Sequence, residues 1–202
     1  MKHILAATAL ALSLAACSPA SDTDPANQAT NMAVQNEAAS VPASPRPPAA
    51  SILTTDVDPQ TLTLDGLGLL RIGQPVDAAS GFAERGAQIP GSTCRTVTSP
   101  AYPGVYAIVE GDAVRRITVG QRSEVKLIEG VGIGATEKQV MADFAGFRAT
   151  PHKYVEAPAK YLTAPNADSG DPALRFEIDR DGRVSAMHVG TMPVLGYVEG
   201  CA

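Results

Sequence analysis

Alternating hydrophobic and polar residues in the C-terminal half of the chain predict four β-strands in two pairs. The segments are residues 106–110, 114–119, 174–178 and 184–189. Gly111-Asp112 separates the first two strands, and a polar turn at residues 179–182 separates the other two. In each pair the second strand stops at a glycine, Gly120 or Gly190. Period-two alternation with turn residues at this spacing predicts two antiparallel hairpins.

A glycine-rich turn followed by a helical pattern precedes each hairpin. In the second half, Thr136 and Gln139 have the spacing of a capping box, and hydrophobic residues recur after them at helical intervals. In the first half, Pro75 suits the opening turn of a helix that ends near Gly81 or Gly86. We therefore predict one short helix before each hairpin.

The order of glycine turn, short helix and strand meander occurs twice, about 65 to 70 residues apart. The sequence therefore predicts an α+β domain over residues 51–202, with one repeat at about 62–120 and another at about 125–202. In this fold the two helix-plus-meander repeats form one antiparallel sheet, and short helices pack on one of its faces.

The first residues have the pattern of a bacterial export signal. A basic start is followed by residues 4–16, an unbroken run of 13 apolar or small residues that is too short to span a bilayer. Leu14-Ala15-Ala16-Cys17 resembles the lipobox, in which cleavage precedes a cysteine that receives a diacylglyceryl group and an N-terminal acyl chain such as palmitate. We expect residues 1–16 to be removed and Cys17 to become a lipid anchor. The alternative is an unmodified cysteine after a signal peptide.

Residues 17–50 differ in composition from the rest of the chain. They are rich in Ala, Pro, Ser, Asn, Gln and Thr and contain no aromatic residue, so they predict a disordered linker between the anchor and the domain. Ser18 stands where inner-membrane lipoproteins carry Asp, which by analogy indicates the outer membrane. We expect the domain to face the periplasm, and exposure at the cell surface is the open alternative.

Composition and motif spacing argue against several classes of ligand. The net charge of −5 and the aromatic content of 4%, with no Trp, do not suit nucleic acid. Gly130, Gly132 and Ala135 match a dinucleotide-binding pattern, but the strands after them are predicted to be antiparallel, and the same glycines recur at residues 66 and 68. His152 and His188 lack partners at metal-ligand spacing. We therefore expect no cofactor and no metal.

Two short motifs in the second half resemble a known family. Residues 133–140 read Ile-Gly-x-Thr-x-x-x-Val, and residues 176–184 read Phe-x-x-Asp-x-x-Gly-x-Val. This pattern resembles the repeat of the SmpA/OmlA (BamE) outer-membrane lipoproteins, and the tandem arrangement resembles the β-lactamase-inhibitor-protein-like (BLIP-like) fold. The resemblance implies the α+β repeat fold and a role in binding other proteins.

Three cysteines predict a single disulfide. With Cys17 lipidated, Cys94 and Cys201 are the two remaining thiols in an oxidising compartment, and such a pair is usually bonded. We predict a Cys94–Cys201 disulfide. The alternative is two separate buried thiols.

The hairpin alternation also predicts which sheet face is open. One side carries the core residues Ile117, Val119, Leu174, Phe176, Ile178, Met187 and Val189. The opposite side carries Arg116, Thr118, Arg175, Glu177, Ala186 and His188. We hypothesise that Arg116, Thr118, Arg175, Glu177 and His188 form an uncovered protein-binding face, at which charge reversal of both arginines would spare stability and abolish binding. The alternative is an ordinary solvated sheet face.

Taken together, these patterns favour a binding protein over an enzyme. We expect a membrane-anchored, periplasm-facing lipoprotein that acts as a protein-interaction or scaffold module, with an envelope protein as its partner. The alternative is a periplasmic hydrolase or transferase that uses a carboxylate pair. No residue of this sequence stands out as catalytic.

Overall fold

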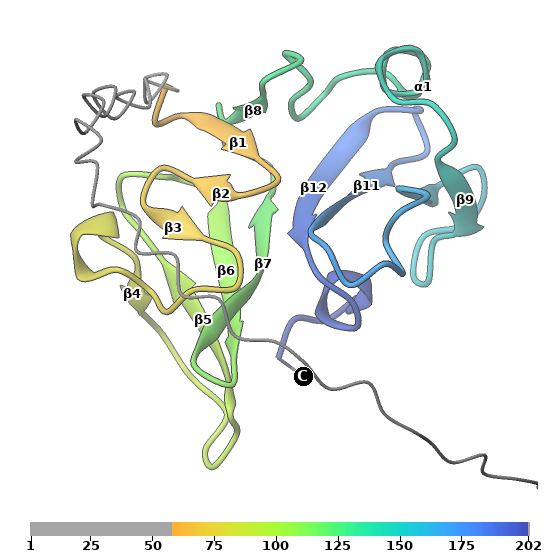
Figure 1. The fold of residues 1–202 in the computed structure, drawn as a ribbon. Helices are drawn as coiled ribbons and strands as arrows, with labels where there is room; N and C mark the ends of the chain where they lie inside the picture. Colours follow the sequence, from red (N-terminus) through yellow and green to blue (C-terminus); the bar gives the residue numbers. More distant parts are fainter. Residues whose placement is uncertain (1–57, 202) are drawn as a thin grey trace, which may run out of the picture. The chain divides into compact units, whose positions relative to one another are not determined.

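The computed structural model describes residues 58–201. The predicted signal peptide at 1–16, the lipidated Cys17 and the linker at 17–50 lie outside these residues. The described part is an α+β domain dominated by two β-sheets (Figure 1). None of its helices is both long and apolar enough to cross a membrane.

The larger sheet has eight strands in the order β4-β5-β6-β7-β12-β11-β10-β9, and every neighbouring pair is antiparallel. In chain order its strands are β4 (Ala83–Glu84), β5 (Cys94–Thr98), β6 (Val105–Glu110), β7 (Ala113–Val119), β9 (Arg148–Pro151), β10 (Lys160–Thr163), β11 (Ala173–Ile178) and β12 (Val184–Gly190). The predicted hairpins are β6–β7 and β11–β12, and both are confirmed. Figure 1 shows β7 and β12 side by side at the centre, where the two groups of four strands meet.

A second, four-stranded sheet was not predicted from the sequence. Its order is β3-β2-β1-β8, from β1 (Thr61–Thr63), β2 (Gly66–Leu67), β3 (Leu70–Arg71) and β8 (Lys126–Leu127). The glycine-rich stretch that was expected only to lead into a helix folds back on itself as this small meander. Gly66 permits the fold-back, because a Cβ at this position would lie 2.0 Å from the carbonyl oxygen of Leu70. The expectation of a single sheet is therefore wrong.

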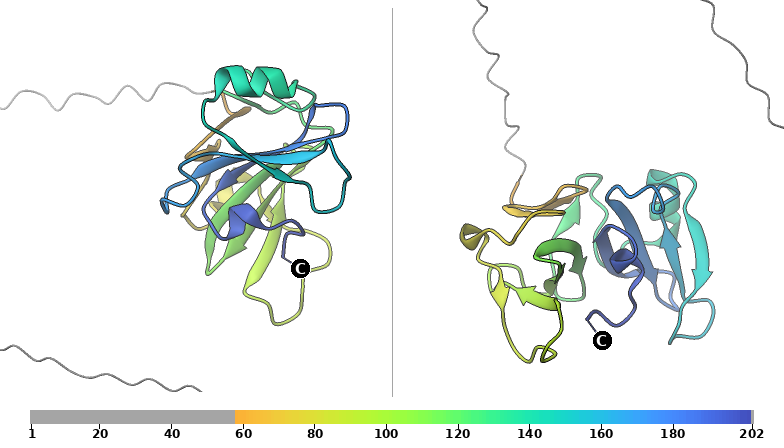
Figure 2. Two further views of the ribbon diagram at one scale, coloured as in Figure 1. Left: turned by 90° about the vertical axis from the view of Figure 1, so that its right-hand side faces the viewer. Right: turned by 60° about the horizontal axis from the view of Figure 1, so that its bottom comes forward.

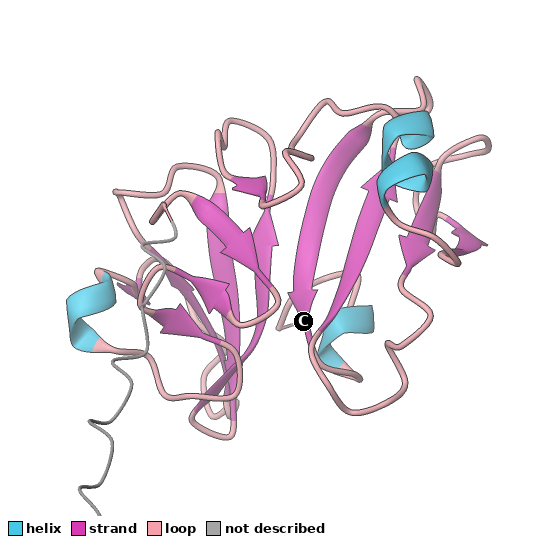
Figure 3. Ribbon diagram, turned by 45° about the horizontal axis from the view of Figure 1, so that its top comes forward, coloured by secondary structure: helices cyan, strands magenta, loops and turns pink. Residues whose placement is uncertain are grey.

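The helical segments are shorter than the sequence predicts, and two of the three are 3₁₀ turns (Figure 3). α1 (Glu137–Asp143) is the single α-helix of residues 58–201, and the Thr136 hydroxyl caps it by accepting a hydrogen bond from the Gln139 amide at 3.2 Å. The predicted first-half helix is only a 3₁₀ turn, η1 (Ala78–Ser80). Gly81 stops it after one turn in the left-handed conformation, at φ 73°. A second 3₁₀ turn, η2 (Val194–Gly196), follows β12.

The core lies on one face of the eight-stranded sheet, as the alternation predicts. Ile117, Val119, Leu174, Phe176, Ile178, Met187 and Val189 are all buried in one hydrophobic cluster. The four-stranded sheet contributes Leu62, Leu67 and Leu70 to that cluster, and α1 contributes Val140. Figure 2 shows α1 lying across one side of the large sheet and η2 on another side. The expectation that all helices share one face is therefore wrong for η2.

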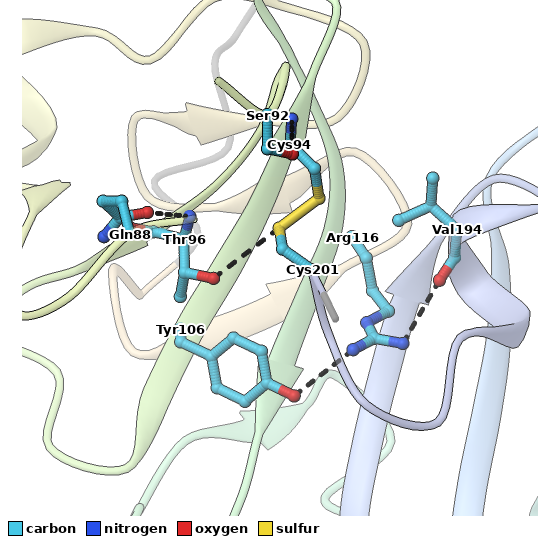
Figure 4. The surroundings of a disulfide bond; sticks show 8 residues. All are labelled: Gln88, Ser92, Cys94, Thr96, Tyr106, Arg116, Val194 and Cys201. Carbon is cyan, nitrogen blue, oxygen red and sulfur yellow. Dashed lines mark hydrogen bonds between the residues drawn. A yellow bond between two sulfur atoms is a disulfide. The ribbon is translucent and has the colours of Figure 1, made fainter. Parts of the chain in front are cut away.

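The other face of the large sheet is covered in part by the end of the chain. We call residues 191–201 the strap. Val194 packs there against Cys94 and Ile108, with Tyr106, Tyr197 and Cys201 around them. The predicted disulfide joins Cys201 to Cys94 on β5, with 5.5 Å between the two Cα atoms (Figure 4). Because the bond closes a sequence separation of 107 residues, it stabilises the fold by about 4 to 5 kcal/mol in the chain-entropy model.

The glycines that end the two hairpins predict opposite mutational outcomes. A Cβ on Gly190 would lie 2.2 Å from the backbone oxygen of Arg115, whereas a Cβ on Gly120 would meet nothing closer than 3.5 Å. We expect Gly190→Ala to cost about 3 kcal/mol because backbone atoms must move, and Gly120→Ala to cost about 1 kcal/mol or less. Urea unfolding of both variants measures this, and equal costs would contradict the close approach at Gly190.

Candidate functional site

The polar side chains of the large sheet form one continuous cluster across its central strands. β7, β12 and β11 are neighbours, and pairing of Thr118 with His188 and of His188 with Arg175 puts these residues on the same face. We call the cluster the polar network. Its members are Arg116 and Thr118 on β7, His188 on β12, Arg175 and Glu177 on β11, Tyr106 on β6, Tyr161 on β10 and His152 after β9.

The structure brings together all five residues of the predicted binding face, but it does not leave them open. Arg116 is 1% exposed, Thr118 3%, His188 4% and Arg175 9%, and only Glu177 is half-buried. The expectation of an uncovered face is therefore wrong at these positions. The cause is the strap and the network's own long side chains, which shield the polar atoms from water.

Arg116 is the most deeply buried charge of the network. It donates hydrogen bonds to the backbone oxygen of Val194 and to the Tyr106 hydroxyl, both at 3.2 Å (Figure 4). It also donates to the backbone oxygen of Tyr197. All of these partners are neutral. Charge reversal at Arg116 would bury an acid against carbonyl oxygens, so it would unfold the domain and is unsuitable as a test of binding.

Arg175 lies on the other side of His188 and is held in a similar way. Its guanidinium carbon stacks 4.0 Å from the centre of the Tyr161 ring, and Nη1 donates to the Leu195 oxygen at 3.3 Å. Burial lowers the pKa of Arg175 from its ordinary value, against the opposing effects of Tyr161 and Glu177, and the charge of Arg116 lowers it further. The group nevertheless remains charged, because an arginine does not deprotonate in proteins.

His188 connects Thr118 to Glu177. Its Nδ1 lies 2.9 Å from the Thr118 hydroxyl oxygen, and its Nε2 lies 3.2 Å from a carboxylate oxygen of Glu177. The carboxylate can only accept, so Nε2 carries the proton and Nδ1 accepts from the threonine. Burial lowers the pKa of His188, the bond to Glu177 opposes this, and the two nearby arginines lower it further. His188 is therefore neutral at pH 7.

Glu177 accepts hydrogen bonds from two histidines. His188 bonds one carboxylate oxygen, and Nε2 of His152 lies 3.4 Å from the other. The His152 ring stacks on Tyr161 with 4.5 Å between ring centres, and its Nδ1 accepts from the amides of Tyr154 and Val155. Burial raises the pKa of Glu177, but the bonds and proximity to His188 and His152 outweigh it and lower the pKa to about 2.

The order of hydroxyl, imidazole and carboxylate along Thr118, His188 and Glu177 is the order found in nucleophilic hydrolases. A substrate cannot reach these groups, because Thr118 and His188 are almost completely buried. A surface hollow of about 380 Å³ is lined by residues 149–152 and 155–160, so it includes His152 but neither Thr118 nor His188. The arrangement therefore acts chiefly to satisfy buried polar atoms.

Metal binding finds no support in the described part of the chain, where no three His, Cys, Asp or Glu side chains are grouped to hold an ion. The acidic loop at residues 179–182 is a hairpin turn, in which Asp179 Oδ1 accepts from the amides of Asp181 and Arg183, both at 2.9 Å. Tyr106, Tyr161 and His152 were not identified from the sequence. Tyr106 and Tyr161 stand at alternating strand positions on the same face as Arg116 and Glu177, and this alternation is the signal that could have identified them.

Comparisons with protein-family models, with curated proteins and with solved structures found no match for this chain.

The carboxylate of Glu177 predicts a pH dependence of stability. Its pKa of about 2 in the folded state lies below the ordinary 4.5, so the unfolded chain takes up this proton first and acid favours unfolding. The stabilisation is complete above about pH 4.5 and is lost as the pH falls toward 2. Protonation of His188 also favours unfolding as the pH falls below 6.5, its ordinary pKa, because its pKa in the folded state is lowered too.

We expect the stability difference between the wild type and Glu177→Gln to shrink by up to about 3 kcal/mol between pH 6 and pH 2. Urea unfolding at several pH values measures it. Glu156→Gln is the matched control, since its side chain is 90% exposed and pairs only with the exposed Arg180. A pH-independent difference for Glu177→Gln would contradict the assigned bonds.

Proposed function

We propose that the chain is a membrane-anchored lipoprotein of the bacterial outer membrane, and that residues 58–201 are a periplasm-facing module that binds another envelope protein. The anchor rests on the lipobox pattern that ends at Cys17. The binding role rests on the form of the large sheet and on the tandem-repeat architecture that we propose for it.

Matching backbone contacts support two tandem repeats. The amide of Gly73 bonds the oxygen of Val114, whose own amide bonds the oxygen of Gln74. In the second half, the amide of Gly134 bonds the oxygen of Val184, whose amide bonds the oxygen of Ala135. In both halves, then, the segment before the helical turn is tied to the first residues of the hairpin's second strand. Both glycines have positive φ, 79° and 83°.

Strand register supports the same proposal. Each hairpin has a register shift near its turn, at residues 108–109 in β6–β7 and at 177–178 in β11–β12. The equivalent residues Val114 and Val184 are 70 residues apart, and the same offset along β7 and β12 makes Thr118 equivalent to His188. These two residues also face each other across the β7–β12 junction. An approximate two-fold axis between repeats would pass through this pair.

The observation that carries the binding role is the incomplete cover of the second sheet face. Eight strands present this face, and the described segments shown to pack on it are the strap of residues 191–201 and, near Tyr161 and Glu177, the loop that carries His152. Around the strap, the half-buried side chains on or beside this face are small, hydroxylic or aromatic, and they include Thr96, Tyr106, Thr163, Ser185 and Ala186. Tyrosine is enriched at protein interfaces, and small hydroxylic residues beside it can adapt their hydrogen bonds to a partner.

A hydrolase or transferase remains the second candidate because of the Thr118–His188–Glu177 chain. Its geometry favours that chemistry, but its burial opposes access. Thr118→Val tests it directly: a hydrolase would lose reaction with a fluorophosphonate probe in this variant, whereas the binding proposal expects no labelling of the wild type at all.

Lipid anchoring predicts that Cys17→Ser moves the protein from the membrane to the soluble fraction and removes its acyl chains. An alkyne-tagged palmitate label followed by membrane fractionation measures both effects. Ser18→Asp is the matched control, since it should keep the label and move the protein from the outer to the inner membrane. A Cys17→Ser protein that stays labelled and membrane-bound would contradict the anchor.

Site-specific photo-crosslinking in the native envelope tests the binding face. We expect p-benzoylphenylalanine at Thr163, on the second sheet face, to give a discrete protein adduct. The same residue at Met141 on α1, which is 44% exposed, should give none, because α1 covers the opposite face. Equal adducts from both sites, or none from Thr163, would overturn the proposed face.

A further inference from the structure

The strap supplies the hydrogen-bond acceptors for both buried arginines. Arg116 donates to the oxygens of Val194 and Tyr197, and Arg175 donates to the oxygen of Leu195. Three carbonyls within four residues of chain thus bind two guanidinium groups. Backbone carbonyls are neutral, so they satisfy the donors without balancing the charge.

Within residues 58–201, neither arginine forms an ion pair with a carboxylate, although five other arginine and lysine side chains do. The Nε atoms of Arg116 and Arg175 are both buried and have no hydrogen-bond partner. Buried donors normally have hydrogen-bond acceptors. A carboxylate would accept hydrogen bonds from these donors and would also balance the positive charge. Arg116 and Arg175 therefore have the chemistry of a carboxylate-binding site, and the strap occupies the position that a carboxylate would take.

The strap is held at its far end by one covalent bond. Cys201 is bonded to Cys94 on β5, and Cys94 is buried whereas Cys201 is half-buried. The remaining attachments are noncovalent. They are the buried side chains of Val194 and Leu195, the arginine bonds to the strap carbonyls, a backbone bond from the Thr191 amide to the Arg115 oxygen at 3.0 Å, and an exposed ion pair between Glu199 and Lys153 at 3.6 Å. Exposed ion pairs stabilise little. Breaking the disulfide therefore leaves a strap that a competing ligand can displace.

We propose that the strap is an autoinhibitory segment locked by the Cys94–Cys201 disulfide, and that its reduction opens Arg116 and Arg175 to a carboxylate group of an acidic protein partner. This inference rests on the proposed binding function and adds to it a regulator and a partner chemistry. In the oxidised protein the guanidiniums stay on the strap carbonyls. In the reduced protein a partner's carboxylates compete for them.

The reductant is a dithiol. One of its thiolates attacks Cys201 Sγ, the more accessible sulfur, and the S–S bond breaks with its electron pair passing to Cys94 Sγ, which takes up a proton. The second thiol of the reductant then attacks the mixed disulfide and releases Cys201 as a thiol. The protein gains two electrons and two protons, and the reductant leaves as its own disulfide.

The test compares the oxidised full-length chain with the Cys94→Ser/Cys201→Ser variant, which is permanently unlocked. Fluorescein-labelled hexaglutamate is the acidic probe and labelled hexalysine is the control probe. We expect the unlocked chain to bind hexaglutamate at least tenfold more tightly than the oxidised chain and to bind hexalysine no better. Arg116→Lys in the unlocked chain should weaken hexaglutamate binding, because the forked donor geometry is lost.

Hydrogen exchange of the strap amides tests the disulfide lock separately from the carboxylate site. The amides of Leu195, Gly196 and Tyr197 are bonded within the strap, and they should exchange at least tenfold faster in the unlocked chain with hexaglutamate than in the oxidised chain. Unchanged exchange would overturn the lock. Faster exchange without tighter hexaglutamate binding would overturn the carboxylate site.

The Thr163 crosslink separates this proposal from the binding function itself. An adduct of equal yield in the oxidised and unlocked chains would overturn the redox control while leaving the binding face in place. Absence of an adduct from both chains would overturn the binding function and this inference together. An adduct that increases in the unlocked chain supports the inference.

Discussion

Arg116 places a permanent positive charge where water hardly reaches it, with 1% of the residue exposed. Such a burial is costly unless the donors of the guanidinium are satisfied. The structure meets this demand for the two terminal nitrogens, with two carbonyls of the strap and the Tyr106 hydroxyl, and leaves Nε without a partner. The position of the strap, and the partial cover that it gives the second sheet face, depend on that interaction, and the disulfide fixes the strap's end.

The same constraint organises the rest of the polar network. Burial, helped by the two buried arginines, keeps His188 neutral, and the hydrogen bonds from His188 and His152 favour the ionised form of Glu177. Neutral His188 can then accept from Thr118 and donate to Glu177 at the same time. Each polar group is oriented by the next, so the central strands are joined by side-chain bonds as well as by their backbone ladder.

Local patterns in the sequence predicted a large part of the fold. Alternation located both hairpins and the seven core residues between Ile117 and Val189, and the capping sequence at Thr136 located α1. Cysteine counting predicted the Cys94–Cys201 bond. These features depend on residues close together in the chain or on simple pairing rules, and for that reason they can be recognised without a structure.

The packing of distant chain segments over the second sheet face could not be predicted in the same way. Alternation places Arg116 and His188 on the non-core face, but it does not say that residues 191–201 return across that face. The four-stranded sheet has strands of only two or three residues, too short for a recognisable period. The His152–Glu177 contact joins residues 25 positions apart through a loop. Burial of the polar network followed from these tertiary contacts.

The accessibility of individual arginines tests the central claim most directly. Phenylglyoxal treatment of the oxidised native chain, with mass spectrometry of the peptides, reports how fast each guanidinium reacts. The account predicts that Arg116 and Arg175 stay unmodified while Arg148 and Arg180, with side chains 55% and 60% exposed, react readily. Modification of Arg116 at the rate of Arg180 would contradict a buried guanidinium beneath the strap.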